Sequence, residues 1–424
     1  MRRLAGIALL GLLAVPAVAH AHGAGAHGLT SVRAAGFTPQ GACDGASIDP
    51  AHVFTGSFSS DQQGSYVLVP FDVPAGTTAV RVKYCFDSND GPLASQAKHT
   101  LDMGVYGARP AAGALWGEDE FRGWGGSSHP DVTISAEGFK SEAEYLASPR
   151  GHVAGKTTRG YRPGPIEPGE WAAELGVAAV VPRTQGDTDG LVRWRVEVEL
   201  SSDPAYADEP YEPAAYDETP ARPGPGWYAG DLHVHAEHSS LGDATMRETF
   251  DFAFGAGGLD FITLSDYVTN SAWGEIGRYQ ADYPGRLIAR SSEIITYRGH
   301  TNNHGSATYV DYRTGPVYEL RPDGGLELRR PRQPASRIFD DVRAAGGWTQ
   351  INHPTIFPSA VPLFPLLCRG CPWDYSDEET DYGKVDAIEI ATGPAGLKDP
   401  LKLCLLYTSP SPRDLSTSRM PSSA

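Results

Sequence analysis

The sequence predicts two structural units in series, an all-β sandwich followed by an α/β barrel. Residues 40–200 carry turn-forming Gly, Pro, Asn or Asp at intervals of about 8–12 residues, with short alternating apolar runs between them, which is typical of antiparallel strands. Residues 201–226 contain six prolines and six acidic residues. From residue 227 onward, strand patterns alternate with helix patterns, as expected of a mainly parallel sheet or barrel. A length of 424 residues suits two or three such domains.

The composition excludes several classes of protein. The chain has 35 basic and 52 acidic side chains, a formal charge of -17, whereas a non-specific nucleic-acid binder needs a basic face. Its 40% hydrophobic and 10% aromatic content excludes a disordered or collagen-like chain. No internal run is long and apolar enough to span a bilayer. We therefore expect no nucleic-acid partner and no membrane span after export, and we leave the oligomeric state open.

Residues 1–21 predict a secretory signal peptide. Arg2 and Arg3 form a basic start, residues 4–19 are apolar, and Ala19-His20-Ala21 fits the cleavage rule. A membrane anchor is the alternative, but the apolar run is short and contains Pro16. The protein is therefore expected to be periplasmic or extracellular, where disulfides are stable.

Residues 404–424 do not resemble the rest of the chain. They contain six serines and three prolines in 21 residues, without periodicity. The stretch resembles the translation of a sequencing-library transposase adapter and its flanking primer, and a natural disordered tail is the alternative. If it is adapter-derived, it is excluded from fold reasoning, and the chain is a fragment whose natural sequence continues past residue 403.

The remaining four cysteines fall into one pair in each half of the chain. In an oxidising compartment this predicts the disulfides Cys43–Cys85 and Cys368–Cys371. The Cys-x-x-Cys spacing of the second pair also occurs in zinc knuckles and redox pairs, but no second such spacing is present.

Residues 22–200 form the predicted sandwich, an accessory domain. In the last strand of this region, Val192, Trp194, Val196 and Val198 alternate with polar residues and should share one face. No cluster of titratable side chains stands out here, and His52, His99, His129 and His152 are scattered singly. The expected strands are 66–73, 79–86, 101–106, 177–181 and 191–200.

The Pro-rich acidic residues 201–226 predict a semi-rigid linker. Residues 227–403 form the second, incomplete domain, in which helix 243–257 is expected to begin with Asp243 as its N-cap. A second helix is expected at 335–347. The expected strands are 228–236, 259–267, 286–297, 348–354 and 385–393.

Histidines and carboxylates gather at the ends of these later strands, where a βα barrel places its active site. His233 and His235 are two apart on a strand, so both imidazoles point to one face and can bind one metal. Each residue alone could be a packing or ion-pairing residue, but together they predict a Zn, Mn or Fe centre with bridging carboxylates. The other candidates at strand ends are Asp266, Glu293, His300, His304 and His353.

Four motifs in register now show a resemblance to a known family. Residues 231–240 (DLHVHAEHSS), 265–267 (SDY), 292–305 (SEIITYRGHTNNHG) and 351–354 (INHP) are similar to those of the PHP (polymerase and histidinol phosphatase) metallohydrolases. The branch they resemble is the CehA/McbA-like one, named after carbaryl hydrolases. The resemblance covers residues 227–403 and, more loosely, 40–200. It implies a distorted α/β barrel of PHP type, truncated at its C-terminal end.

The resemblance also implies roles for individual residues. His233 and His235 would hold one ion, Glu293 would bridge to a second, and His300 and His353 would hold that second ion. A further ligand would be either His238 or Asp243. Tyr267 stands where the family has a ligand histidine, next to Asp266, and the family's late Asp-x-His pair is missing. We therefore expect two divalent ions, with three as the alternative.

The chemistry expected of such a centre is hydrolysis by a metal-bridged hydroxide, with the ions stabilising the developing oxyanion. Tyr267, Asn270 or Asn302 could orient the substrate, and Arg290 or Arg298 could meet a phosphate, although an arginine near an acid is more often a plain ion pair.

The predicted function is a secreted metal-dependent phosphoesterase acting on a small molecule. Its alternatives are an ester, amide or carbamate hydrolase of the carbaryl-hydrolase type and a catalytically degenerate, metal-containing binding protein.

Overall fold

A computed structural model of the chain describes residues 39–41, 51–89, 91, 98–149, 152–219, 221–240, 242, 244–354, 372–390 and 419–421. The first nine strands are β1 Pro39–Gly41, β2 His52–Ser59, β3 Tyr66–Val73, β4 Ala79–Asp87, β5 Thr100–Tyr106, β6 Phe121–Gly126, β7 Asp131–Ser135, β8 Gly169–Ala179 and β9 Leu191–Ser201. The later strands are β10 Trp227–Val234, β11 Phe261–Leu264, β12 Leu287–Thr296, β13 Gly299–His304, β14 Val317–Leu320, β15 Leu326–Arg330, β16 Trp348–Ile351, β17 Ala387–Ile388 and β18 Arg419–Pro421.

Few of the elements are helical. The α-helices are α1 Glu142–Ala147, α2 Met246–Asp251, α3 Trp273–Gln280, α4 Ala335–Ala344 and α6 Asp377–Thr380. Single turns of 3-10 or π helix are η1 Ser60–Gln62, η2 Arg183–Gln185, η3 Pro204–Ala207, η4 Phe252–Ala256 and η5 Tyr382–Lys384. The molecule is therefore rich in sheet.

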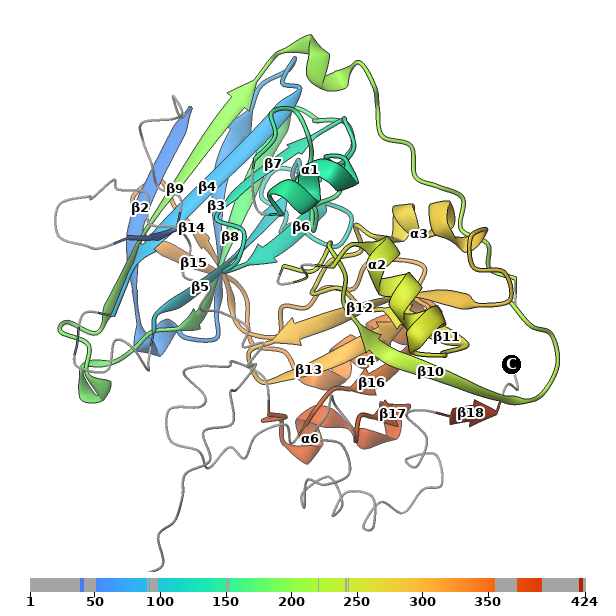
Figure 1. The fold of residues 1–424 in the computed structure, drawn as a ribbon. Coiled ribbons are helices and arrows are strands. Elements are labelled where there is room, and N and C mark those ends of the chain that lie inside the picture. Colours follow the sequence, from blue (N-terminus) through green and yellow to red (C-terminus); the bar gives the residue numbers. More distant parts are fainter. Residues whose placement is uncertain are drawn as a thin grey trace, which may run out of the picture.

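Two mainly antiparallel sheets, built chiefly from the first half of the chain, pack together (Figure 1). One has the order β1-β4-β9-β2, with β7 also paired to β4, and the other has the order β15-β14-β3-β8-β5-β6. Their facing side chains form one apolar core. In β9, Val192, Trp194, Val196 and Val198 are all buried in this core, which confirms their predicted common face. We call these two sheets the two-sheet unit.

The six-stranded sheet includes two strands from the second half of the chain. β14 pairs in parallel with β3, so that Val317 lies opposite Tyr66, and β15 extends the sheet beyond β14. Figure 1 shows these orange strands among the blue and green ones. The region that the sequence analysis assigned to the second domain therefore also contributes two strands to a sheet of the first.

The second face of this sheet is buried as well. Every residue of β5 is buried, and β8 is buried from Trp171 onward. A second apolar cluster joins Tyr66 and Leu68 of β3 to Ile294 of β12 and Phe339 of α4. In a sheet that is covered on both faces, successive residues of a strand are buried instead of alternating between buried and exposed. This explains the continuous burial of β5 and β8.

A buried network of ion pairs also joins the six-stranded sheet to residues from the second half of the chain. Arg313 is fully buried, and its guanidinium contacts Asp311 at 2.9 Å and Glu174 of β8 at 3.4 Å. It also donates to the carbonyl of Trp116 at 2.8 Å. Arg330 of β15 bonds the other oxygen of Asp311 at 2.7 Å. Because charges this deeply buried must be paired, the network fixes the register between the two halves.

Asp102 is expected to make stability pH-dependent. Burial, with a smaller effect from Glu174, raises its pKa to about 7, although the Tyr297 hydroxyl donates to it at 2.9 Å. An acid whose folded pKa is raised binds extra protons in the folded state, so its stabilising contribution is lost as pH rises from about 4 to about 7. In urea unfolding, the free energy of unfolding of wild type relative to Asp102→Asn should fall by about 2–4 kcal/mol across that window. Parallel curves for the two proteins would contradict this.

A third sheet forms the second unit; it has the order β17-β16-β13-β12-β11-β10-β18 and curls into a half-barrel. β10, β11 and β12 are parallel neighbours, as are β16 and β17. β13, however, runs antiparallel to both β12 and β16. The prediction of a mainly parallel sheet is therefore corrected to a mixed one, because Thr296 to Gly299 form a tight hairpin in place of a helical crossover. Within the described residues the sheet does not close into a barrel.

Helix α2 begins later than the sequence predicted. Its N-cap is Thr245, whose hydroxyl accepts from the Glu248 amide while the Glu248 carboxylate accepts from the Thr245 amide. This capping box uses the side chain three residues further on. The predicted N-cap, Asp243, is wrong by two residues and itself lies outside the described residues.

The predicted linker lies against the second unit. Tyr211 donates its hydroxyl to Glu275 of α3, and Tyr216 donates to the Ile288 carbonyl of β12. The segment is thus held by side-chain contacts as well as by its prolines.

Three predictions concern the ends of the chain and the cysteines. Cys85 is disulfide-bonded, as predicted; Cys43, Cys368 and Cys371 lie outside the described residues, as do the signal peptide and most of the tail. β18 of the tail pairs with Trp227–Ala229, and the adapter origin of residues 404–424 stays a prediction. In the described part of the chain, no helix is long and apolar enough to cross a bilayer.

Candidate metal centre

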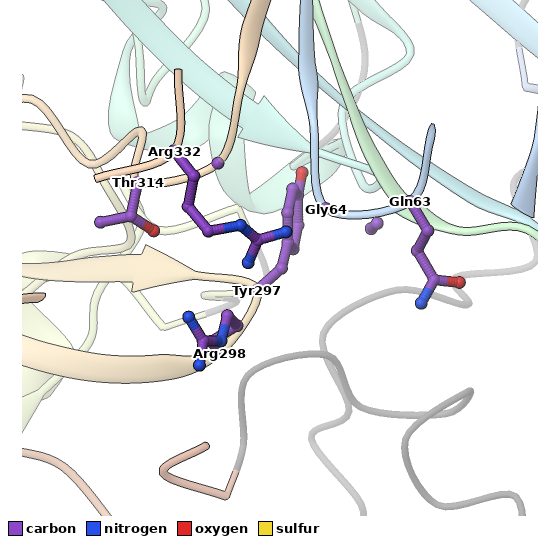
Figure 2. Close-up of a pocket in the computed structure, with 8 residues that line it drawn as sticks. Gln63, Gly64, Tyr297, Arg298, Thr314 and Arg332 are labelled. Carbon is purple, nitrogen blue, oxygen red and sulfur yellow. The ribbon is translucent and has the colours of Figure 1, made fainter. Parts of the chain in front are cut away.

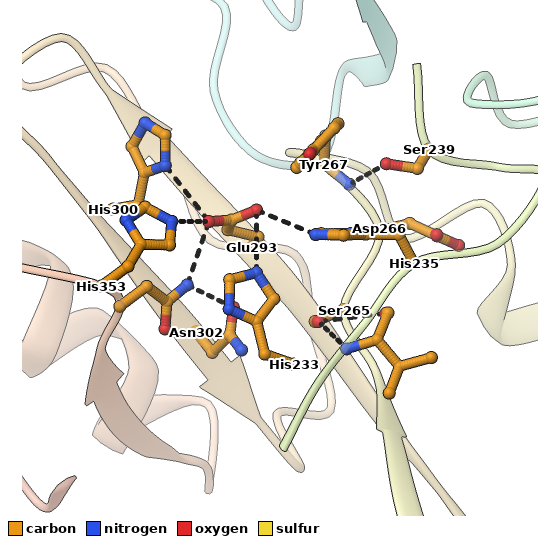
Figure 3. A network of polar contacts seen from close by, with 12 residues as sticks. His233, His235, Ser239, Ser265, Asp266, Tyr267, Glu293, His300, Asn302 and His353 are labelled. Atoms are coloured by element: carbon orange, nitrogen blue, oxygen red, sulfur yellow. Dashed lines mark hydrogen bonds and ion pairs between the residues drawn. The ribbon is translucent and has the colours of Figure 1, made fainter. Parts of the chain in front are cut away.

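Four imidazoles converge on one buried carboxylate, that of Glu293 (Figure 3). Oε2 of Glu293 lies 3.2 Å from Nε2 of His233 and 3.4 Å from Nε2 of His235. Its Oε1 lies 3.2 Å from Nδ1 of His300 and 3.3 Å from Nε2 of His353. The Glu293 side chain is inaccessible to solvent. Five of the predicted ligands are therefore brought together.

The mixed sheet explains how residues far apart in sequence meet. His233 lies near the carboxyl end of β10, and His353 follows β16, which runs the same way. β13 returns antiparallel from the hairpin, so His300 lies at its start and next to the same edge. Glu293 comes from the central strand β12, directly opposite Asn302. Four strands thus deliver side chains to one edge of the sheet.

The backbone beside the cluster is strained. Among the described non-glycine residues, only Val268, His353 and Asp381 have positive φ, at 58°, 27° and 51°. Val268 is β-branched, for which this conformation is a genuine outlier, and its amide donates to the Glu293 carbonyl at 2.7 Å. Strain of this kind costs about 1–3 kcal/mol and persists where surrounding contacts impose it, often at functional sites.

Burial and mutual charge shift the pKa values of the clustered side chains. Burial alone would lower the pKa of His233, but Glu293 and Glu389 outweigh it and hold that pKa well above its usual value. Burial would likewise raise the pKa of Glu293, but His233 and the bonded His300 and His353 hold it well below. For His235, burial and then the charge of His233 lower the pKa to about 3. Glu293 is therefore anionic and His235 neutral, which are the forms that bind a metal.

The residues fit divalent ions. Two ligands bound to one tetrahedral ion at ~2.1 Å lie roughly 3.4 Å apart, close to the nitrogen–oxygen separations around Glu293. Within the described part of the chain, His235 Nδ1 is buried without a hydrogen-bond partner. Ligand atoms of His233, Glu293 and His353 lie within 4.8 Å of one another. An imidazole and carboxylate set of this kind suits Zn, Mn or Fe.

Asp266 and Tyr267 border the cluster from β11. Asp266 Oδ1 accepts from the Ala236 amide at 2.8 Å, and burial raises its pKa to about 7. The Tyr267 ring lies 4.2 Å from the ring of His235, and its backbone pairs with Glu293. Burial raises the pKa of Tyr267 well above its usual value. Asp266 therefore supports the loop after His235, while Tyr267 covers that imidazole.

His238 has different neighbours. Its Nδ1 lies 2.9 Å from the Ser271 hydroxyl, and its ring packs edge-on against Phe139 at 4.7 Å. Burial, and then Arg159, lower its pKa well below the usual value. Among the described contacts, none joins His238 to Glu293. It packs toward the two-sheet unit, and its competitor as a ligand, Asp243, is outside the described residues.

Asn302 is bonded at both ends of its amide. Its Nδ2 donates to the Leu232 carbonyl at 2.7 Å, and its Oδ1 accepts from Asn352 at 2.8 Å. Asn352 in turn donates to Glu293 Oε1 at 3.1 Å. The structure thus assigns Asn302 a supporting contact in place of the predicted substrate contact. Asn352, which the sequence analysis missed, lies inside the Ile351–Pro354 motif.

His304 does not join the cluster. It lies four residues beyond His300 on β13, about 13 Å along an extended strand, and β13 runs away from the site. Its Nδ1 lies 3.1 Å from the Ser291 hydroxyl, and its ring packs at a tilt against that of Trp348, with the centroids 4.1 Å apart. The expectation that His304 lies at the site end of a strand is wrong, because it placed His304 in the segment after strand 286–297, whereas residues 299–304 form a further strand, β13, antiparallel to β12.

Glu389 is a further residue that the sequence analysis missed. It follows β17, and its Oε2 lies 3.0 Å from Nδ1 of His233. Glu389 lies within the predicted strand 385–393 and directly after the observed β17, and the strand ends of parallel sheets converge.

The two arginines considered for phosphate contacts form ion pairs. Arg298 is bidentate with Glu379, at 2.5 and 2.7 Å. Arg290 lies 3.9 Å from Glu218 and stacks on Tyr216. Figure 2 shows Arg298 beside a cavity of about 120 Å³ between the two units. None of the predicted metal ligands lines this cavity, which is bounded by Gln63, Gly64, Ala178, Tyr297, Arg298, Thr314, Gly315 and Arg332.

Comparison with known proteins gives little similarity. No protein-family model matches the chain, and no curated protein matches it in sequence. Among solved structures, it is similar to a two-domain protein from Bacteroides vulgatus described as containing a predicted PHP-like metal-dependent phosphoesterase, with 21% sequence identity and a TM-score of 0.29. The match covers 43% of this chain and 49% of that one, so the chain spans about half of its length. A TM-score this low does not establish a shared fold.

Proposed function

We propose that this protein is an exported, metal-dependent hydrolase of the PHP type that cleaves a small phosphoester. The observation that carries the proposal is the convergence of four imidazoles on the buried carboxylate of Glu293. These side chains come from separate strands, and the backbone beside them is strained. Apolar packing does not require such an arrangement. Its donor atoms suit a hydrolytic centre of two divalent ions.

The ligand assignment follows the contacts. His233 and His235 share Oε2 of Glu293, and His300 and His353 share Oε1. This division suits one ion on each side of a bridging carboxylate. Divalent ions in such a centre lower the pKa of water and polarise the oxygen under attack. Two ions, Zn or Mn or Fe, are proposed, since Tyr267 replaces the histidine that the family resemblance assigns to a third.

Residues around the ligands would hold the substrate. Tyr267 lies against His235, and its raised pKa keeps the hydroxyl protonated, so it can donate a hydrogen bond to a substrate oxygen. Asp266, whose pKa of about 7 is near neutrality, holds the Ala236 amide. Since Arg290 and Arg298 are bound by acids, we assign the neutralisation of a phosphate to the ions.

Export is proposed on two observations. Residues 1–21 have the composition of a signal peptide, and Cys85 is disulfide-bonded. Structural disulfides are typical of oxidising compartments. We propose the periplasm or the extracellular space.

The test compares an aryl phosphodiester with a naphthyl ester and a naphthyl carbamate, each with Mn or Zn. We expect metal-dependent hydrolysis, faster with the phosphodiester. Faster carbamate or ester cleavage would place the substrate in the carbaryl-hydrolase class and overturn the phosphoester proposal. Metal binding without any hydrolysis would favour a binding protein.

A variant of a proposed substrate-contacting residue, Tyr267, extends this test. Tyr267→Phe removes the hydroxyl and keeps the ring over His235, so kcat should fall about 10-fold or more, by the loss of one oxyanion donor. Metal content should not change. Metal analysis of the wild-type protein should give two ions per chain, and three would contradict the two-ion proposal.

A further inference from the structure

Glu389 contacts two of the proposed ligand residues at once. Its Oε2 lies 3.0 Å from Nδ1 of His233 and accepts from the backbone amide of His353, also at 3.0 Å. The side chain is 6% exposed. Glu389 is held there by β17, which pairs in parallel with β16, and by its own amide, which donates to the Ile351 carbonyl at 2.8 Å. Its position is therefore set by the sheet.

The two nitrogens of His233 face two different carboxylates. Nδ1 faces Glu389, while Nε2 faces Glu293 at 3.2 Å, on the side where the other imidazoles gather. An imidazole that donates through Nδ1 to a carboxylate keeps the lone pair of Nε2 available to a metal. A carboxylate in this place also fixes the ring's rotation and makes it a stronger donor. Glu389 thus lies on the outer side of His233, away from the shared carboxylate of Glu293.

The second contact acts on the backbone of His353. This residue has a φ of 27°, which a non-glycine residue rarely adopts. The hydrogen bond from its amide to Glu389 helps to hold that conformation, and its Nε2 reaches Glu293 at 3.3 Å. One oxygen of Glu389 therefore contacts both the His233 side chain on β10 and the His353 backbone after β16. The family resemblance assigns these two residues to different ions.

We infer that Glu389 is a positioning residue for the metal centre: it fixes the Nδ1-protonated form of His233 and the strained backbone of His353. The inference rests on the proposed metal-binding function. It goes beyond that function by naming an outer residue that couples the two halves of the centre. Loss of such an outer carboxylate typically costs 10–100-fold in metal affinity.

The experiment measures Mn and Zn affinity by chelator competition in the full-length protein, for wild type, Glu389→Gln and Glu389→Ala. We expect Glu389→Ala to lower the affinity 10–100-fold and Glu389→Gln to lower it less, because the amide oxygen can still accept a hydrogen bond. The matched control is Glu379→Gln, which removes an acid bound to Arg298 and should leave the affinity within twofold of wild type.

A second readout separates positioning from a general loss of structure. In zinc-loaded protein with 15N-labelled histidine, the His233 Nδ1 signal should be that of a protonated nitrogen bonded to a carboxylate, and it should shift in Glu389→Gln. Equal affinities in wild type, Glu389→Gln and Glu379→Gln would overturn the inference while leaving the proposed function intact. If wild type itself binds neither ion, the proposed function and this inference both fail.

Discussion

Replacing Glu293 by glutamine is expected to reduce metal affinity more than 100-fold and hydrolysis to background. Among the residues that the structure describes, Glu293 is the carboxylate that all four imidazoles of the cluster contact, and both of its oxygens are used. Glutamine keeps the size of the side chain but presents an NH₂ group to one pair of histidines. Removing an outer carboxylate already costs 10–100-fold, so removing a shared ligand should cost more. Metal content after dialysis and turnover of the preferred substrate give the measurement.

The same substitution at Glu379 is the control, since Glu379 pairs with Arg298 and lies outside the cluster. It should leave metal content and turnover unchanged. If Glu293→Gln retained two ions and wild-type turnover, the centre would not be built on this carboxylate and the proposed function would be wrong.

Replacing Arg313 by methionine is expected to lower the free energy of unfolding by about 3–5 kcal/mol, because it leaves buried acids without their cation. Arg313 is fully buried between Asp311 and Glu174 and stacks on Tyr106 at 4.5 Å. Asp311 keeps Arg330, but the remaining contact of Glu174 is the Tyr312 hydroxyl. Urea unfolding followed by fluorescence gives the measurement.

Arg321→Met provides the matched comparison, since the Arg321–Glu327 pair is about half exposed on both sides. An exposed pair contributes little, so this change should cost less than about 1 kcal/mol. Adding Glu174→Gln to Arg313→Met should restore part of the lost stability. Equal costs for the two arginine variants would show that the buried network does not stabilise the contact between the two units.

The parts of the site that were predictable from sequence are those encoded by local spacing. His233 and His235 are two apart in a predicted strand and are expected to point the same way, and Glu293, His300 and His353 lie in or just after the predicted strands 286–297 and 348–354. Val192 to Val198 likewise alternate, and their common buried face follows from the pleat alone.

The predictions that were wrong depend on contacts between segments distant in sequence. His304 was misplaced because β13 is antiparallel, and strand direction depends on whether a turn or a crossover precedes it. Asn302 was taken for a substrate contact because its partners, Leu232 and Asn352, are distant in sequence. The addition of β14 and β15 to the first sheet was not predictable either, because β14 pairs with a strand about 250 residues earlier.

The sequence by itself determined the strand-rich character of the chain, the change of pattern near residue 227 and the residues able to bind metal, because composition and periodicity are local properties. Only the tertiary structure decided which of those residues meet at Glu293, that Glu389 supports His233 from outside, and that Arg313 joins the two units. These contacts depend on strand order and direction, which follow from the burial of whole sheets and are not written in any single segment.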